Sequence, residues 1–197
     1  ARSAEPVSGA VVSEFLLTPL PLTGLFNVQH KRHEDQRGHF ARLFCEGGLS
    51  AFGQSFHIRQ INHSCTRERG SVRGLHYQKA EQPEAKLITC LRGEVWDVAV
   101  DLRPDSETFL NWHAEHLCAG DGRSLLIPAG FAHGFQTLTD DAELLYLHSA
   151  DYAPDHEGGL SVLDPRLAIA WPLVVKNLSA RDASHPLLDP QFVGVRL

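Results

Sequence analysis

The segment EVWDVAVDL, residues 94–102, alternates its side chains with a period of two. Four apolar residues, from Trp96 to Leu102, fall on one face of an extended chain, and the other face carries Asp97 and Asp101. Because successive side chains of a strand point to opposite sides of a sheet, this pattern predicts a β-strand and not a helix. We expect both aspartates to reach toward the interior and to take part in a supporting polar network.

Short segments of the same character recur along the chain, separated by turn signals such as RPDS and AGDG. The further strand candidates are residues 25–30, 39–44, 56–64, 72–78, 86–91, 111–117, 124–128, 134–138 and 142–149. Helix is expected only near 48–52 and 179–183, and strands do not alternate with helices. The chain therefore predicts a single all-β domain over 1–197, a sandwich or small barrel with a few short helices, the jelly roll among them. Residues 1–20 are expected to form a partly disordered or dimer-exchanged arm.

The composition argues against a nucleic-acid-binding protein and against a membrane-spanning one. A net charge of −6 gives no support to general nucleic-acid binding. No apolar run approaches the ~20 residues that span a bilayer. The cysteines, at 45, 65, 90 and 118, lack the spacing of zinc ligands or of a disulfide framework, which favours free thiols in a reducing cytoplasm.

One motif points to a specific barrel. In GRSLLIPAGFAH, residues 122–133, the order Gly122, Pro128, Gly130, His133 resembles the second motif of the cupins, jelly-roll proteins in which this histidine lines the barrel mouth. Pro and Gly at this spacing favour a tight turn between two strands.

The first cupin motif supplies an H-x-H pair and a later glutamate, and here it is altered. The pair reads His76-Tyr77-Gln78, and Lys86 occupies the glutamate position. Lysine is a poor ligand for a divalent metal at neutral pH. The substitutions predict a pocket that contains no metal and needs no cofactor.

The surrounding segments resemble the dTDP-4-dehydrorhamnose 3,5-epimerase family, a metal-free branch of the cupins. The segments that carry the resemblance are HEDQRGHFARLF (33–44), QINHS (60–64), SVRGLHYQ (71–78), KLITCLRGEVWDVAVDLR (86–103), LLIPAGFAHGF (125–135), AELLYLHSADY (142–152) and LSARDASHPLLD (178–189). They follow one another in this order over roughly residues 20–190. The resemblance implies a cupin-type jelly-roll barrel and an isomerase.

The resemblance also implies roles for the residues that match. The family removes a proton next to the 4-ketone of a nucleotide-linked 4-keto-6-deoxyhexose and returns one to the opposite face, which requires a base, an enolate-stabilising group and an acid. His76 matches the base, Asp182 orients it, and Lys86 lies against O4 of the sugar. Tyr146 matches the acid, and His133 lines the pocket near O4.

Substrate binding is implied in the same way. Arg73 and Arg37 match positions that hold the diphosphate, a task suited to the planar guanidinium. Phe40 matches an aromatic residue that the partner subunit contributes through exchanged N-terminal strands, which implies a homodimer. Four further residues match positions near the nucleotide or sugar: Gln60, Asn62, Tyr152 and Glu157.

Each of these residues also has an ordinary structural role available to it. A single strand histidine such as His76 is more often a core or surface residue, and Asp182 alone resembles a helix N-terminal charge. Tyr146 alone resembles a packed strand aromatic. The functional interpretation depends on the motifs in which they occur.

We therefore predict a cytoplasmic, cofactor-independent epimerase that inverts C3 and/or C5 of an NDP-4-keto-6-deoxyhexose. An alternative is inversion at one of these carbons only, on a CDP- or GDP-linked sugar. Two further alternatives from other classes are a metal-dependent cupin oxygenase or isomerase and a non-catalytic sugar-binding cupin. No nucleic-acid or membrane partner is expected.

Overall fold

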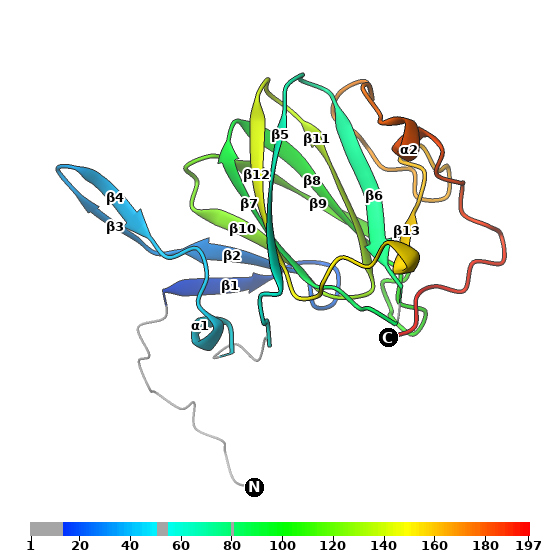
Figure 1. The fold of residues 1–197 in the computed structure, drawn as a ribbon, viewed down its shortest axis with the longest axis horizontal. Coiled ribbons are helices and arrows are strands. Elements are labelled where there is room, and N and C mark those ends of the chain that lie inside the picture. The colour runs from blue at the N-terminus through cyan, green and yellow to red at the C-terminus, as the bar shows by residue number, and fades with distance from the viewer. Residues whose placement is uncertain (1–13, 51–54, 80) are drawn as a thin grey trace, which may run out of the picture.

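The computed structural model describes residues 14–50, 55–79 and 81–197, and most of these residues belong to two facing antiparallel sheets (Figure 1). The six-stranded sheet has the order β1-β2-β10-β7-β12-β5, and the five-stranded sheet the order β13-β6-β11-β8-β9. The strands of the first sheet are β1 (Phe15–Pro19), β2 (Phe26–His30), β10 (Arg123–Ile127), β7 (Lys86–Arg92), β12 (Ala142–His148) and β5 (Gln60–Thr66). Those of the second are β13 (Glu157–Gly159), β6 (Val72–Gln78), β11 (Phe131–Thr137), β8 (Glu94–Asp101) and β9 (Trp112–Cys118). This is the predicted cupin-type jelly roll.

The remaining elements are peripheral. Strands β3 (Arg32–Asp35) and β4 (Gly38–Ala41) form a separate hairpin that extends away from the barrel in Figure 1. The helical elements are α1 (Glu46–Ser50), the 3₁₀ turn η1 (Pro154–His156) and α2 (Ala180–Ala183). No helix in the described ranges is long and apolar enough to cross a membrane.

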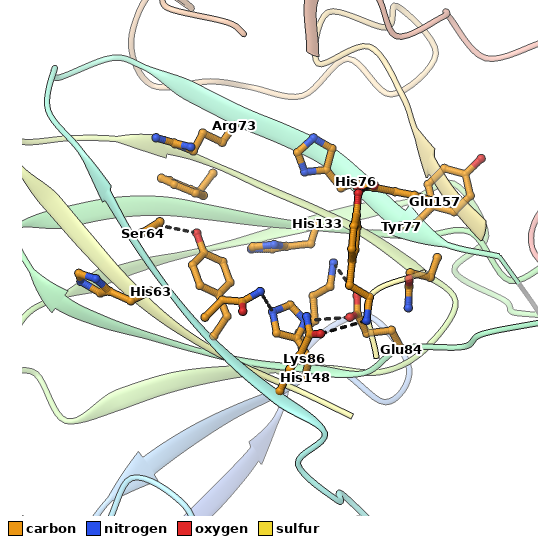
Figure 2. A pocket seen from close by; sticks show the side chains of 16 residues that line it. His63, Ser64, Arg73, His76, Tyr77, Glu84, Lys86, His133, His148 and Glu157 are labelled. Carbon is orange, nitrogen blue, oxygen red and sulfur yellow. Dashed lines mark hydrogen bonds and ion pairs between the residues drawn. The ribbon is translucent and has the colours of Figure 1, made fainter. Parts of the chain in front are cut away.

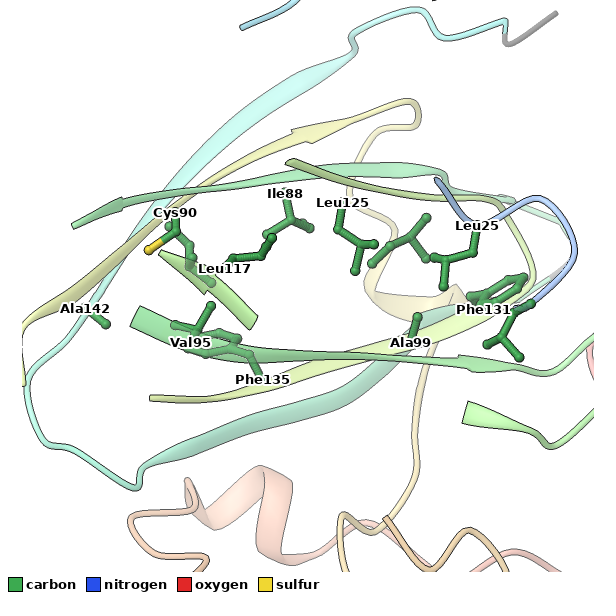
Figure 3. Close-up of a cluster of buried hydrophobic side chains, with 13 residues drawn as sticks. Leu25, Ile88, Cys90, Val95, Ala99, Leu117, Leu125, Phe131, Phe135 and Ala142 are labelled. Atoms are coloured by element: carbon green, nitrogen blue, oxygen red, sulfur yellow. The ribbon is translucent and has the colours of Figure 1, made fainter. Parts of the chain in front are cut away.

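The main core lies between the sheets. Ile88 and Leu125 of the six-stranded sheet pack against Val95, Ala99 and Phe135 of the five-stranded sheet, and all five side chains are almost completely buried (Figure 3). Burying a side chain such as leucine or isoleucine contributes roughly 1.5–3 kcal/mol. This cluster accordingly holds the two sheets at a fixed separation.

The strand predicted from residues 94–102 is buried on both faces. Val98 and Val100, on the face opposite the main core, pack with Leu160, Val162 and other residues of the C-terminal segment. That segment crosses the outer face of the five-stranded sheet and covers it. The alternation of β8 therefore separates two cores rather than a core and solvent.

Most strand predictions are confirmed within a few residues, with four differences. The candidate at 56–64 becomes a strand only from Gln60, and β1, β3 and β13 were not predicted. Strand β1 pairs with β2 of the same chain at the edge of the six-stranded sheet. The rest of the expected N-terminal arm, residues 1–13, lies outside the described residues.

Candidate active site

A polar cavity of about 290 Å³ opens between the two sheets, beside the main core. It forms where period-two alternation places polar residues at the inner positions of the strands. On β12, for example, Leu144 belongs to the core, and Tyr146 and His148, two and four residues further, line the cavity. Nine of the residues predicted for the site line it: Gln60, Asn62, Arg73, His76, Lys86, His133, Tyr146, Tyr152 and Glu157.

A bulge in β6 brings Arg73 and His76 to the same cavity. Residues three apart on a regular strand point to opposite faces. Here, β6 pairs Arg73 with Phe135 and His76 with His133, so three steps on β6 face two on β11. The extra residue returns both side chains to the inner face, where both line the cavity.

Glycine is required at the bulge because the backbones of β6 and β11 approach closely. Gly74 has φ of +127°, and a Cβ at this position would lie 2.6 Å from the Cα of Gly134. No other residue fits this conformation and this contact without moving a strand.

His76 is paired with a buried carboxylate. Its Nε2 donates a 2.7 Å hydrogen bond to Oδ1 of Asp182, which is only 5% exposed. The short helix α2 places Asp182, whose backbone N–H donates to the N-cap Ser179 Oγ. Because Nε2 carries the proton, the lone pair of Nδ1 remains available for a substrate proton.

The surroundings of His76 keep its ring neutral. Burial lowers its pKa below the ordinary value, and this effect outweighs the hydrogen bond to Asp182, which raises the pKa. A neutral imidazole hydrogen-bonded to a buried carboxylate is the arrangement of a general base.

Tyr146 projects from the six-stranded sheet, so it faces the cavity from the side opposite to His76. Its hydroxyl forms a 3.0 Å hydrogen bond with Ser64 Oγ, and burial raises its pKa. The hydroxyl therefore keeps its proton at neutral pH. A protonated phenol on one wall and a neutral imidazole on the other can act on the two faces of one molecule.

Lys86 is held in a buried charge network that sequence reasoning missed. Its Nζ lies 3.3 Å from Glu84 Oε2, and His148 Nδ1 donates a 2.8 Å hydrogen bond to the other carboxylate oxygen. Burial alone would raise the pKa of Glu84, but His148 and Lys86 reverse this and lower it. Figure 2 shows Glu84, Lys86 and His148 together, with His76 on β6 beyond them.

The same network reaches Tyr146 and Asn62. The rings of His148 and Tyr146 stack with centroids 6.0 Å apart, and Asn62 Nδ2 donates to His148 Nε2 at 3.3 Å. The signal for these residues was weak in the sequence, because Glu84 lies in a loop and His148 near the end of a strand. Only the pairing of β7 with β12 places His148 opposite Lys86.

His133 is fixed by Asp97, as expected for a supporting network. Its Nε2 lies 2.9 and 3.0 Å from the two carboxylate oxygens of the fully buried Asp97. Asp101 is also fully buried and belongs to a polar network, as expected, but this network is a different one from that of the cavity. The Asp101 carboxylate is at the far end of β8 and binds Arg103, Ser106 and Thr108, which lie outside the cavity.

Gln78 does not complete a metal pair with His76. Its amide nitrogen donates to the carbonyl of Gln82, and its amide oxygen accepts from the backbone N–H of Ala153. It joins two loops at the rim of the cavity, so its side chain has a structural role.

The cavity mouth carries cationic and polar groups. Arg73 is anchored by hydrogen bonds to Thr66 Oγ1 (2.9 Å) and to the Cys65 carbonyl (3.4 Å). Tyr152 donates its hydroxyl proton to Glu157, and the backbone N–H of Tyr152 donates to Gln60. These contacts hold the rim in place without occupying the centre of the cavity.

Arg37 and Phe40 lie outside the cavity of their own chain. Both are on the β3–β4 hairpin, where Arg37 pairs with Asp35 and the Phe40 side chain is 64% exposed. Figure 1 shows this hairpin extending away from the barrel. Within one chain, the structure does not bring these two residues to the other predicted site residues.

The fold and the site together define a jelly-roll protein of the cupin type with groups for acid–base chemistry on facing sheets. A family model described as dTDP-4-dehydrorhamnose 3,5-epimerase matches residues 19–190. The dTDP-4-dehydrorhamnose 3,5-epimerase of Mycobacterium tuberculosis is 39% identical over 86% of this chain and 86% of that protein. The dTDP-4-dehydro-6-deoxyglucose 3-epimerase of Streptomyces bikiniensis is 38% identical over 86% and 87%.

A solved structure agrees with these relatives. The 3,5-epimerase of Legionella pneumophila, in complex with dTDP-4-keto-L-rhamnose, superimposes with a TM-score of 0.86 at 36% identity, over 93% of this chain and 98% of that chain. The chain belongs to the dTDP-4-dehydrorhamnose 3,5-epimerase family, and it is an isomerase.

Proposed function

We propose that this chain inverts C3 and C5 of a dTDP-linked 4-keto-6-deoxyhexose. The observation that carries the proposal is that His76, paired with Asp182 of α2, lies on one sheet and the protonated Tyr146 lies on the other, with the cavity between them. The solved relative with dTDP-4-keto-L-rhamnose supports this class of substrate.

In the proposed reaction, His76 Nδ1 removes the proton from a carbon next to the C4 ketone. The C–H electron pair becomes the enolate, whose oxygen is stabilised by the Lys86 ammonium and by nearby His133. Tyr146 then gives its proton to the opposite face of the same carbon. Exchange with solvent removes the proton from His76 and restores the one on Tyr146, so no cofactor is consumed.

We further propose that the nucleotide lies at the cavity mouth. Arg73 has the charge and fork geometry to bind the diphosphate. Gln60, Asn62, Tyr152 and Glu157 surround the remaining space and offer hydrogen bonds or an aromatic surface. Their positions on the lining support this orientation of the substrate.

The active unit is proposed to be a homodimer in which the hairpin of each chain reaches the other's cavity. The support is that Arg37 and Phe40 are exposed on a projecting hairpin with no role in their own chain's cavity. Such exchange would place a second arginine and an aromatic ring at the diphosphate and nucleotide positions. We place the enzyme in the cytoplasm, a setting consistent with its four free cysteines.

Inversion at C3 alone is the second candidate, favoured by the 38% identity to a relative named as a 3-epimerase. Incubation with dTDP-, CDP- and GDP-linked 4-keto-6-deoxyhexoses in heavy water, followed by NMR, tests both candidates. Deuterium at C3 and C5 supports the main proposal, and deuterium at C3 alone supports the second. No exchange with any of these sugars would contradict both.

A further inference from the structure

His185 lies beside the His76–Asp182 pair and has no assigned role. Its ring meets that of His76 edge-on, with centroids 5.6 Å apart. Its Nε2 is buried and has no hydrogen-bond partner among the described residues. Buried polar atoms without partners are uncommon in folded proteins, so this one requires an explanation.

Packing against β13 fixes the position of the His185 ring. Gly159 of β13 lies directly against the ring, and a Cβ at that position would overlap the imidazole. The side chain is only 12% exposed, so it is packed and does not move freely in solvent. The orphaned nitrogen is therefore directed toward Asp182 by its surroundings.

Three possible ligand atoms converge there. His76 Nε2 and His185 Nε2 lie 2.7 and 3.7 Å from the same Asp182 oxygen, and all three atoms lie within 4.8 Å of one another. In tetrahedral zinc sites, with bonds of 2.0–2.2 Å, ligand atoms are about 3.3 Å apart. Small side-chain movements would bring the three atoms to this spacing.

We propose that His76, Asp182 and His185 form a reversible binding site for a divalent transition-metal ion of the zinc type, and that occupation of this site inhibits the enzyme. Two imidazoles and one carboxylate suit Zn²⁺ and not Mg²⁺ or Ca²⁺, which prefer oxygen ligands. The site differs from the usual cupin positions, because neither Lys86 nor Gln78 takes part. His76 is 31% exposed, and His76 and Asp182 both line a second pocket next to the pair, which gives the ion access.

Inhibition follows from the tautomer of His76. Without metal, Nε2 carries the proton and donates it to Asp182, so Nδ1 is free to act as the base. A metal on Nε2 displaces that proton, and the neutral ring then carries its proton on Nδ1. The ring gains and loses one proton through solvent, with no net change, but the nitrogen that faces the substrate can no longer accept one.

The binding test is titration of the full chain with ZnCl₂ by calorimetry, and with Co²⁺ by visible absorption. We expect one strong site per chain, weakened at least tenfold in His185→Ala. Gly159→Ala is expected to weaken binding as well, because it displaces a ligand without removing one. His156→Ala, which changes a histidine outside the site, is the matched control and should bind as the unchanged protein does.

The inhibition test rests on the proposed function and compares solvent exchange with and without Zn²⁺. We expect inhibition over the concentration range of binding, reversal by EDTA, and resistance of His185→Ala relative to its own metal-free rate. Absence of the strong site, or binding by His185→Ala and Gly159→Ala as strong as that by the unchanged protein, would overturn the proposal. Absence of exchange in metal-free protein would instead contradict the proposed function and leave the binding result standing.

Discussion

His76 and Asp182, 106 positions apart in the sequence, are joined by a 2.7 Å hydrogen bond across the edge of the five-stranded sheet. The first prediction concerns this pair. His76→Ala removes the base, and we expect deuterium exchange to fall by roughly 10²–10⁴-fold. Asp182→Asn keeps the shape but weakens the control of the tautomer, so it should also lower kcat strongly. Circular dichroism should show both variants folded, and unchanged exchange in His76→Ala would reject the base assignment.

Tyr146→Phe separates proton removal from inversion. The ring still stacks on His148, but the hydroxyl that bonds Ser64 is lost. His76 can then remove a proton and return a solvent-derived one only to the same face. NMR in heavy water should show slow deuterium uptake with retained configuration, whereas Ser64→Ala should still invert. Normal inversion by Tyr146→Phe would mean that another group is the acid.

The pH dependence follows from the shifted pKa of His76. Burial lowers this pKa below 6.5, so the base stays neutral near pH 7, and kcat/KM should fall only as pH drops through the lowered value. The Asp182 contact raises the pKa, so Asp182→Asn should move this acidic limb to lower pH. At the other end, burial raises the pKa of Tyr146, so its ionisation should not reduce activity below about pH 10. If the acidic limb of the kcat/KM profile moved to higher pH in Asp182→Asn, the assignment of this limb to His76 would be contradicted.

Glu84 should stabilise the fold more than exposed acids do. Glu84→Ala leaves Lys86 buried without its partner, which we expect to cost about 3–5 kcal/mol of unfolding free energy. Glu84→Gln retains an acceptor for His148 and should cost about 1–3 kcal/mol. The control is Asp151→Asn, because Asp151 pairs with Arg59 on the surface and should contribute less than about 1 kcal/mol. Denaturant unfolding measures all three, and equal losses in Glu84→Ala and Asp151→Asn would argue against a buried network.

Hairpin exchange can be tested by mixing two impaired variants. In a heterodimer of Arg37→Ala with His76→Ala, one cavity has an intact His76 and receives an intact Arg37 from the other chain. Random mixing after refolding or coexpression should restore about a quarter of the sites. If each chain supplied both residues to its own cavity, the mixture would stay impaired. Light scattering provides the matching measurement of the oligomeric state.

The sequence was most informative where a residue pattern has one physical solution. The alternation in β8 and β12 predicted strands because an extended chain has a period of two. Pro128 and Gly130 predicted a tight turn between two strands, and the resemblance to the second cupin motif implied that His133 lines the barrel mouth. The same alternation could not show that β8 is covered on both sides, because the covering segment follows about sixty residues later and has no regular pattern.

Some residues of the candidate site could be identified from the sequence, and others only from the structure. Motifs identified His76, Lys86, Tyr146 and Asp182, since each lies in a segment with a recognisable order of residues. Glu84 lies outside these segments, and His148 lies in the segment 142–152 but has no role assigned by it. Both become part of the site only because β7 and β12 are paired. His185 acquires its position only because Gly159 leaves space for its ring.

By itself, the sequence determined the all-β class, most of the strands and the identity of the chemical groups, because these depend on local periodicity and on side-chain type. Only the tertiary structure decided which groups share an environment. The bulge at Gly74 turns Arg73 and His76 to one face, and sheet pairing sets His76 across the cavity from Tyr146. Burial then lowers the pKa of His76 and raises the pKa of Tyr146. These properties arise from desolvation and contact between distant segments, which exist only in the folded chain.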